Sequence, residues 1–187
     1  MTQMTTCSEF TLRPATEDDI PSLQALIEAS VRALQAGDYT PAQIEGALGT
    51  ALGLDTQLIA DRTYFVAEAT SPFQPHFAGC GGWSKRKTLF GADHGPGREP
   101  ALLDPASDAA KVRAIFVHPA CARRGLGSLI LATVEEAARA AGFRRFELGS
   151  TLTGVPLYRL RGYVETDRIV VPLANGESVP VVRMVKS

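Results

Sequence analysis

The stretch AIFVHPACARRGLGS, residues 114–128, decides the fold of this chain. Extended back to Lys111, its first part is apolar on both faces, which is typical of a central strand covered on both sides. After a short loop come Gly125 and Gly127, separated by one residue at the start of a helix. Glycines at such a place let the backbone bend tightly and approach a ligand. The stretch therefore predicts a strand, a glycine-rich loop and a helix that meet at a binding site.

The loop has the properties of an anion site. The N–H groups in the first turn of a helix lack partners within the helix and lie at the positive end of its dipole. Arg123 and Arg124 add full positive charge, which suits a phosphate or pyrophosphate. Two nucleotide motifs do not match, because no G-x-x-x-x-G-K-[ST] run exists and G-x-G-x-x-G would need glycine in place of Ile130. The alternative is a glycine-rich turn that only joins a strand to a helix.

The rest of the sequence predicts one mixed α/β domain over residues 1–187, with residues 1–9 flexible. Three glycines within 77–84 indicate a bulge or a close backbone approach, and Gly91–Ala109 reads as a long functional or mobile loop. Apolar spacing predicts helices at about 17–35, from Thr40 to a break near Gly53, over Asp55–Asp61, at about 126–141 and around Val155–Arg161. Strands are expected at 10–14, 64–69, 77–84, 111–117, 143–150, 163–173 and 178–186.

Composition excludes several classes of protein. The formal net charge is -1, without the basic excess of a nucleic-acid binder. No apolar run approaches the ~18 residues of a membrane helix, and the first ten residues lack the pattern of a secretory signal. Three cysteines, Cys7, Cys80 and Cys121, suit neither a disulfide framework nor a zinc site, and the three histidines show no metal-ligand spacing. We expect a cytoplasmic protein without metal, as a monomer or a homodimer.

Taken together, the motifs resemble the acetyl-CoA site of the GNAT superfamily of N-acetyltransferases. The matching pieces are F-V-H-P at 116–119, R-R-G-L-G at 123–127 and L-Y-R-L-R-G-Y at 157–163, in the order of the family. The opening L-R-P-A at 12–15, followed by D-D-I at 18–20, is similar to the first strand and helix of that family. The resemblance covers about residues 10–186. It implies an α/β fold with a mostly antiparallel central sheet, a splayed pair of strands and about four flanking helices.

The resemblance also implies roles for individual residues. The pantetheine arm of CoA would pair with the backbone of Phe116 and Val117, and Thr151 takes the place of an Asn that often starts the small helix. Tyr158 matches the usual acid, which protonates the departing CoA thiolate, whereas Tyr163 is expected to be core. A phenol of pKa ~10 can serve a thiol of pKa ~8.5. The pyrophosphate would rest on the backbone amides of Arg123, Arg124, Gly125, Leu126, Gly127 and Ser128.

The chain departs from the family pattern in two further places. The loop has Ala122 where the family often has Arg or Gln, which leaves a site made mainly by backbone N–H groups. The central strand has Lys111 and Arg113 but no glutamate to position a water for deprotonation of the amine. The general base is therefore open among Asp93, His94, Glu147 and Glu68.

The sequence thus predicts an acetyl-CoA-dependent N-acetyltransferase that acts by direct attack of a primary amine. Catalysis through Cys121 as an acyl nucleophile is the weaker interpretation, because no histidine can be placed beside it. Two other classes stay open: an acyl-CoA-binding domain without activity, and an interaction module that binds no CoA. The acceptor side is expected to come from the first two helices, the Gly79–Trp83 strand and the Gly91–Ala109 loop.

Overall fold

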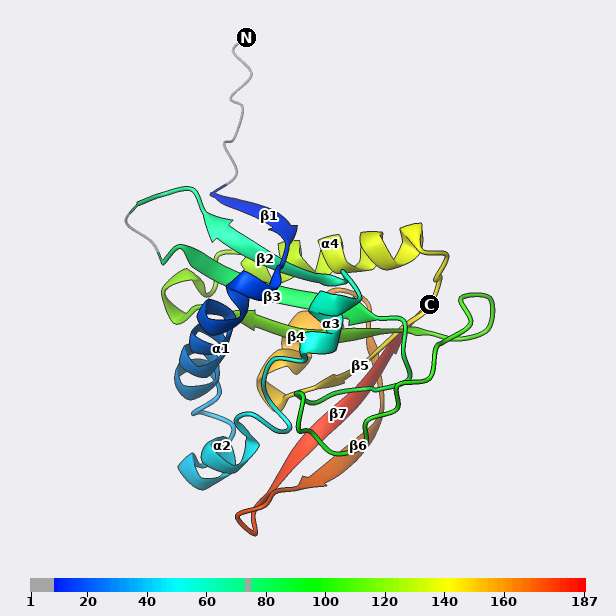
Figure 1. Cartoon of the computed structure of the whole chain (residues 1–187). Coiled ribbons are helices and arrows are strands. Elements are labelled where there is room, and N and C mark those ends of the chain that lie inside the picture. Colours follow the sequence, from blue (N-terminus) through cyan, green and yellow to red (C-terminus); the bar gives the residue numbers. More distant parts are fainter. Residues whose placement is uncertain (1–8, 73–74) are drawn as a thin grey trace.

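The computed structural model describes residues 9–72 and 75–187, which form a seven-stranded sheet in the order β1-β2-β3-β4-β5-β7-β6 (Figure 1). The strands are β1 (Phe10–Pro14), β2 (Tyr64–Ala69), β3 (Phe77–Ser84), β4 (Ala110–Val117), β5 (Phe146–Ser150), β6 (Val164–Pro172) and β7 (Ser178–Lys186). The α-helices are α1 (Ile20–Leu34), α2 (Pro41–Ala47), α3 (Thr56–Ala60), α4 (Leu126–Ala140) and α5 (Val155–Leu160). Short 3-10 turns precede α1, α4 and α5 at Glu17–Asp19, Pro119–Cys121 and Leu152–Gly154.

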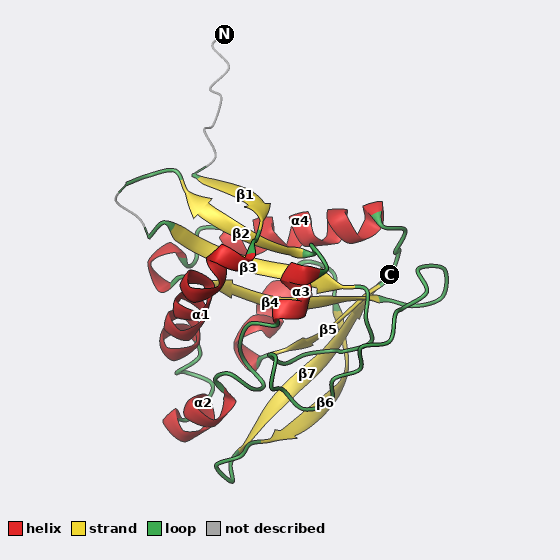
Figure 2. Ribbon diagram, viewed as in Figure 1, coloured by secondary structure: helices red, strands yellow, loops and turns green. Residues whose placement is uncertain are grey.

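Helices cover both faces of the sheet, and a separate apolar core lies under each (Figure 2). On one face α1 buries Leu23, Ile27 and Val31. On the other face α4 buries Ile130 and Val134. Strand β4 contributes to both cores, which confirms the expectation of a central strand covered on both sides.

The neighbouring strands β4 and β5 diverge along their length (Figure 1). They run parallel but pair only through Ala110 with Phe146 and Lys111 with Glu147. Further along β4, Ala114 has a φ of 51°, which interrupts the regular strand. All other strand pairs are antiparallel. The predicted mostly antiparallel sheet with a splayed pair of strands is therefore confirmed.

The glycines of β3 do both things that were expected of them. The register with β4 shifts between Cys80 and Gly82, which marks a bulge. A side chain at Gly79 or Gly81 would collide with Ile130 of α4, since a Cβ atom would lie 2.7 Å from it at either position. The glycines therefore let α4 pack closely on the sheet.

Some element boundaries differ from the sequence prediction. The helix that starts at Thr40 ends at Ala47 instead of near Gly53, because Leu48 is extended and Gly49 has a φ of 76°. The strand expected from residue 143 begins at Phe146, separated by three residues from a turn at Ala141 and Gly142. Five α-helices lie within the described ranges, at the five places where apolar spacing predicted them.

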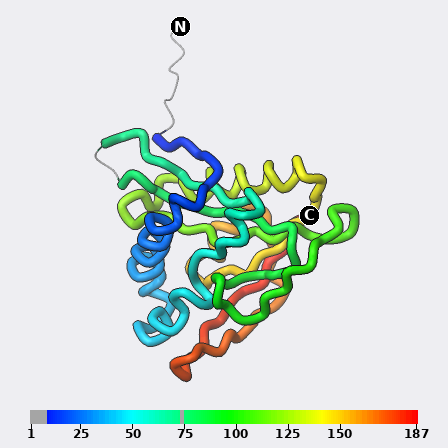
Figure 3. Tube along the Cα trace, in the orientation of Figure 1, coloured from blue at the N-terminus to red at the C-terminus, as the bar shows by residue number. Residues whose placement is uncertain are grey.

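Residues 85–109 form the long connection between β3 and β4 that Figure 3 lets the reader follow. As expected, 91–109 contains no helix or strand. The connection is nevertheless tied to α3: Asp93 accepts hydrogen bonds from the backbone N–H and the hydroxyl of Thr56, at 2.8 and 3.0 Å. Arg98 donates to the Asp55 carboxylate at 3.1 Å.

Cys7 and most of the segment expected to be flexible lie outside the described residues. Within 9–72 and 75–187, no helix combines the length and the apolar character needed to cross a membrane. The same ranges hold no group of three or more His, Cys, Asp or Glu side chains that could bind a metal ion.

Candidate active site

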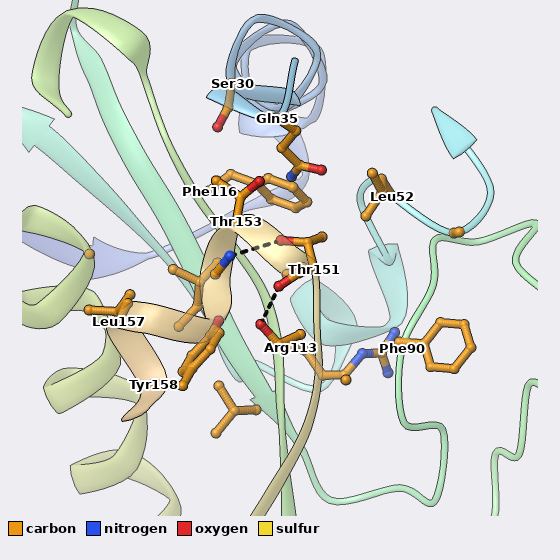
Figure 4. Close-up of a pocket in the computed structure, with 18 of the residues that line it drawn as sticks. Ser30, Gln35, Leu52, Phe90, Arg113, Phe116, Thr151, Thr153, Leu157 and Tyr158 are labelled. Atoms are coloured by element: carbon orange, nitrogen blue, oxygen red, sulfur yellow. Dashed lines mark hydrogen bonds between the residues drawn. The ribbon is translucent and has the colours of Figure 1, made fainter. Parts of the chain in front are cut away.

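A cavity of about 210 Å³ lies at the divergence of β4 and β5. One part of its wall comes from β4, the start of α4 and α5, where Phe116, Val117, Gly127 and Tyr158 line it. The other part comes from the end of α1, the segment after α2 and the start of the long loop (Figure 4). The cavity thus joins the elements of the CoA motif to part of the expected acceptor side, namely α1 and Gly91 of the long loop, whereas the second helix and the Gly79–Trp83 strand do not line it.

The glycine loop leaves backbone N–H groups open at the start of α4, and of its residues 123–128 Gly127 lines the cavity. Gly125 is the N-cap of α4 with a φ of 81°, and no side chain caps the helix. Arg123 also has a positive φ, of 62°. The first-turn N–H groups of Leu126, Gly127 and Ser128 are those that a helix leaves without internal partners. This arrangement of backbone donors at a helix N-terminus fits a pyrophosphate.

The arginines near the loop are arranged differently from what the sequence indicated. Arg124 pairs with Glu9 at 2.7 Å and lies over the ring of Phe10, so its charge is directed toward β1. Arg161, at the end of α5, was not singled out from the sequence. Its Nε donates to the Ser128 hydroxyl at 3.1 Å, which places a guanidinium at the first turn of α4.

The edge of β4 that faces β5 is available beyond Lys111. On its other side the strand pairs with β3 as far as Val117, which is opposite Gly79. Toward β5 the described strands form no pairs after Lys111, so in the stretch that ends with Phe116 and Val117 the backbone groups of every second residue face that side without a strand partner. An extended amide chain such as pantetheine can hydrogen-bond to such an edge.

Tyr158 lines the cavity from α5 and is 9% exposed. Burial raises the pKa of its phenol, which keeps the group protonated at neutral pH. Within the described residues its hydroxyl makes no hydrogen bond. Tyr163, by contrast, is 3% exposed and donates to the Glu135 carboxylate at 2.9 Å, which confirms that it belongs to the core.

Thr151 lines the cavity beside Tyr158 and caps the turn before α5. Its hydroxyl accepts a hydrogen bond from the Gly154 N–H at 3.2 Å. The next residue, Leu152, donates its N–H to the hydroxyl of Tyr39 at 2.9 Å. Tyr39 in turn donates to the carbonyl of Pro180, so the chain after α1 is fastened to this end of the site.

None of the four candidate bases lines the cavity. Glu68 pairs with Arg13 on β1. Glu147 is buried between Lys111 and Arg183; burial raises the pKa of its carboxyl, but the two cations outweigh that effect and hold it below the usual value. The remaining two, Asp93 and His94, line a second cavity between α1 and the long loop.

Arg113 is the charged side chain that lines the cavity, and its partner could not be read from the sequence. It lies 2% exposed and donates to Asp55 at 3.0 Å and to the carbonyl of Gly91 at 2.6 Å. A buried cation needs such a partner. The sequence did indicate that partners exist, because Lys111 and Arg113 lie in an otherwise apolar strand and buried cations require acidic side chains from elsewhere in the fold.

With this geometry established, the comparisons identify the family. The sequence model of the acetyltransferase (GNAT) family matches residues 29–163, and the chain belongs to this family. No curated protein gives a match.

Solved structures of this fold agree. An N-acetyltransferase of this family from Rhodopseudomonas palustris has 22% identity and a TM-score of 0.68, with 96% of each chain covered. A putative acetyltransferase from Salmonella typhimurium, solved with acetyl-CoA, has 18% identity and a TM-score of 0.61, covering 96% of this chain and 94% of that one. An N-acetyltransferase from Thermoplasma acidophilum, in complex with coenzyme A, has 13% identity and a TM-score of 0.64, covering 95% and 98%.

Proposed function

We propose that this protein is an acetyl-CoA-dependent N-acetyltransferase that acetylates a primary amine of a small molecule or peptide. The observation that carries the proposal is that one cavity is lined by Gly127 of the glycine loop, by the edge of β4 that faces β5, and by the buried Tyr158. Family membership makes acyl transfer from a CoA thioester the reaction to expect. A cytoplasmic location is part of the proposal, because Cys80 is a buried thiol and reduced thiols suit that compartment.

Acetyl-CoA supplies a thioester whose carbonyl carbon the amine attacks. In this proposal the N–H groups from Arg123 to Ser128 hold the pyrophosphate, and the backbone of Phe116 and Val117 holds the pantetheine arm. These contacts fix the thioester in the cavity, and an amine that binds beside it is held at attack distance, which supplies much of the acceleration. Tyr158 donates its proton to the thiolate as the carbon–sulfur bond breaks.

The amine is proposed to react without a carboxylate or imidazole base. Among the described residues that line the cavity, none carries such a group. The amine must therefore bind in its neutral form, and the proton that it loses after attack passes to water. Turnover at neutral pH is then expected to rise with the neutral fraction of the amine.

The absence of a base from the cavity wall also favours the second candidate, an acyl-CoA-binding domain without activity. The two functions differ in whether an amine causes the release of free CoA from acetyl-CoA. We would measure CoA release from acetyl-CoA over a panel of primary amines, together with the dissociation constant of acetyl-CoA. Release that depends on an amine supports the enzyme, whereas tight binding without release at any amine supports the binding domain. If acetyl-CoA does not bind, both are wrong.

A further inference from the structure

Gln35 lines the cavity with an amide whose oxygen has no hydrogen-bond partner among the described residues. It follows α1 and is 6% exposed, and its side chain lines the cavity wall. Its Oε1 is the buried side-chain atom without a hydrogen-bond partner in the described part of the chain. Figure 4 shows the amide pointing from the end of α1 into the space between Phe116 and Leu52.

A buried acceptor without a partner carries a cost of about 1–3 kcal/mol, and one at a functional cavity calls for a ligand. Only the side chain of Gln35 lacks a partner, because its backbone N–H donates to Val31 and its backbone carbonyl accepts from Tyr39. Ser30, five residues earlier in the chain, also lines the cavity, and its hydroxyl makes no hydrogen bond to the described residues. Ser30 lies on α1 and Gln35 directly follows it, so both polar groups are on the acceptor side.

Apart from Thr153, whose hydroxyl donates to the exposed Asp38 at 2.6 Å, the rest of the acceptor wall is apolar and carries no usable charge. Leu34, Ala51, Leu52 and Phe90 supply its apolar surface. Arg113 is the one charged side chain among the described lining residues, and its guanidinium already donates to Asp55 and to backbone carbonyls. Among the described residues that line the cavity, a second ammonium on the acceptor would therefore meet no carboxylate, and a carboxylate would meet no cation free of a partner.

We propose that Gln35 accepts a hydrogen bond from an N–H or O–H of the acceptor, and that the acceptor is a monoamine that is uncharged apart from its reacting amine and has an apolar body. This inference rests on the proposed function and narrows its substrate class. It excludes diamines, polyamines and amino acids as good acceptors, because their second charge would be buried without a partner.

The test measures binding of four five-carbon amines to the complex with CoA, which cannot react. The amines are pentylamine, 5-amino-1-pentanol, 1,5-diaminopentane and 5-aminopentanoate. Because all four carry the same amine, the cost of removing its proton is common to them. We expect the two amines without a second charge to bind at least tenfold more tightly than the other two. A diamine or amino acid that binds best, or no amine binding at all, would overturn the proposal.

Variants of Gln35 give the second arm. Gln35→Leu should weaken the best uncharged amine about tenfold, the worth of one buried hydrogen bond. Gln35→Glu should shift the preference toward 1,5-diaminopentane. Gln24→Leu, an exposed position on the same helix, is the matched control and should change neither result.

The melting temperature separates ligand binding from a structural role for Gln35. If Gln35 binds the acceptor, Gln35→Leu removes an unpaired buried acceptor, and its melting temperature should be unchanged or raised. A lower melting temperature with unchanged amine affinities would overturn the proposal. If amines bind as expected but no CoA is released by acetyl transfer, the inference about binding stands and the proposed catalytic function fails.

Discussion

The hydroxyl of Tyr64 donates a 2.9 Å hydrogen bond to the carbonyl oxygen of Ala114, the β4 residue with a φ of 51°. Tyr64 is fully buried on β2, which is separated from β4 by β3, so its side chain reaches across one strand to the irregular residue. A non-glycine residue with positive φ is strained, and it persists where its surroundings hold it. The hydrogen bond from Tyr64 thus stabilises the irregular conformation of β4, the strand that lines the cavity.

We therefore predict that Tyr64→Phe weakens both the fold and the binding of acetyl-CoA. The carbonyl of Ala114 loses its partner, which should lower the free energy of unfolding by about 1–3 kcal/mol. The relaxed strand should raise the dissociation constant of acetyl-CoA severalfold. Urea denaturation and calorimetric titration measure the two effects. Tyr163→Phe is the control, because it also removes a buried hydroxyl but lies away from β4, and it should leave the dissociation constant unchanged.

The glycine loop gives a second prediction. A Cβ atom at Gly127 would lie 3.2 Å from Leu157, on the wall of the cavity. We expect Gly127→Val to raise the dissociation constant of acetyl-CoA at least 100-fold, because the branched side chain blocks the approach to the backbone. Calorimetric titration measures it, and unchanged affinity would contradict the anion-site interpretation.

Gly125 differs from Gly127 because its constraint is its positive φ, and a Cβ atom there would meet nothing within 4 Å. Gly125→Ala should cost about 1 kcal/mol of stability through backbone strain. Gly176→Ala is a matched control, since Gly176 has a φ of 86° and equally open space in the turn between β6 and β7. Both variants should lose similar stability, but affinity for acetyl-CoA should change in Gly125→Ala alone.

The sequence predicted the central part of the fold well because its signals are local. The β4–α4 stretch has apolar periodicity and glycines at the turn, and these act over a few residues. Boundaries failed where local preference is weak, as after Ala47, where Gly49 adopts a positive φ and ends the helix early. The acceptor side could not be predicted for a different reason. The ion pair between Asp55 and Arg113 joins residues 58 positions apart, and Gln35 has no motif around it.

A third prediction concerns the pH dependence of stability. The Arg13 guanidinium bonds to the Asp19 carboxylate at 2.7 and 2.9 Å and lowers the pKa of that carboxyl from 3.8 to about 2. A carboxyl whose pKa is lowered by folding stabilises the fold above its unfolded pKa, and this contribution is lost as pH falls toward the folded value. Arg13 is 37% exposed, so solvent screens the pair and about 1 kcal/mol is expected.

Asp19→Asn should therefore lower the free energy of unfolding by about 1 kcal/mol at pH 7 and pH 5, and by less as the pH falls from 4 to 2. Urea denaturation of both proteins across this range measures the difference. The exposed neighbour offers the control variant Asp18→Asn, which should show no such loss. A difference that stays constant down to pH 2 would mean that the carboxylate charge is not responsible.

The last prediction separates catalysis from binding at Tyr158. Tyr158→Phe keeps the ring, which packs edge-on against Tyr163 with the centroids 5.7 Å apart, and removes the proton that the phenol can give. If Tyr158 protonates the thiolate, turnover should fall about 100-fold. The dissociation constant of acetyl-CoA should hardly change, because the hydroxyl acts on charge that develops in the transition state.

The pH profile adds an independent readout for the same residue. Because burial raises the pKa of Tyr158, the phenol stays protonated beyond pH 10, and turnover of the unaltered protein should show no decline from this group below that pH. The measurement is kcat from pH 6 to 10 for both proteins with one amine, together with the acetyl-CoA dissociation constant. Equal turnover in the two proteins would make Tyr158 structural, and a parallel loss of affinity would mean that it shapes the thioester pocket. The assignment as general acid requires that the rate falls while binding does not.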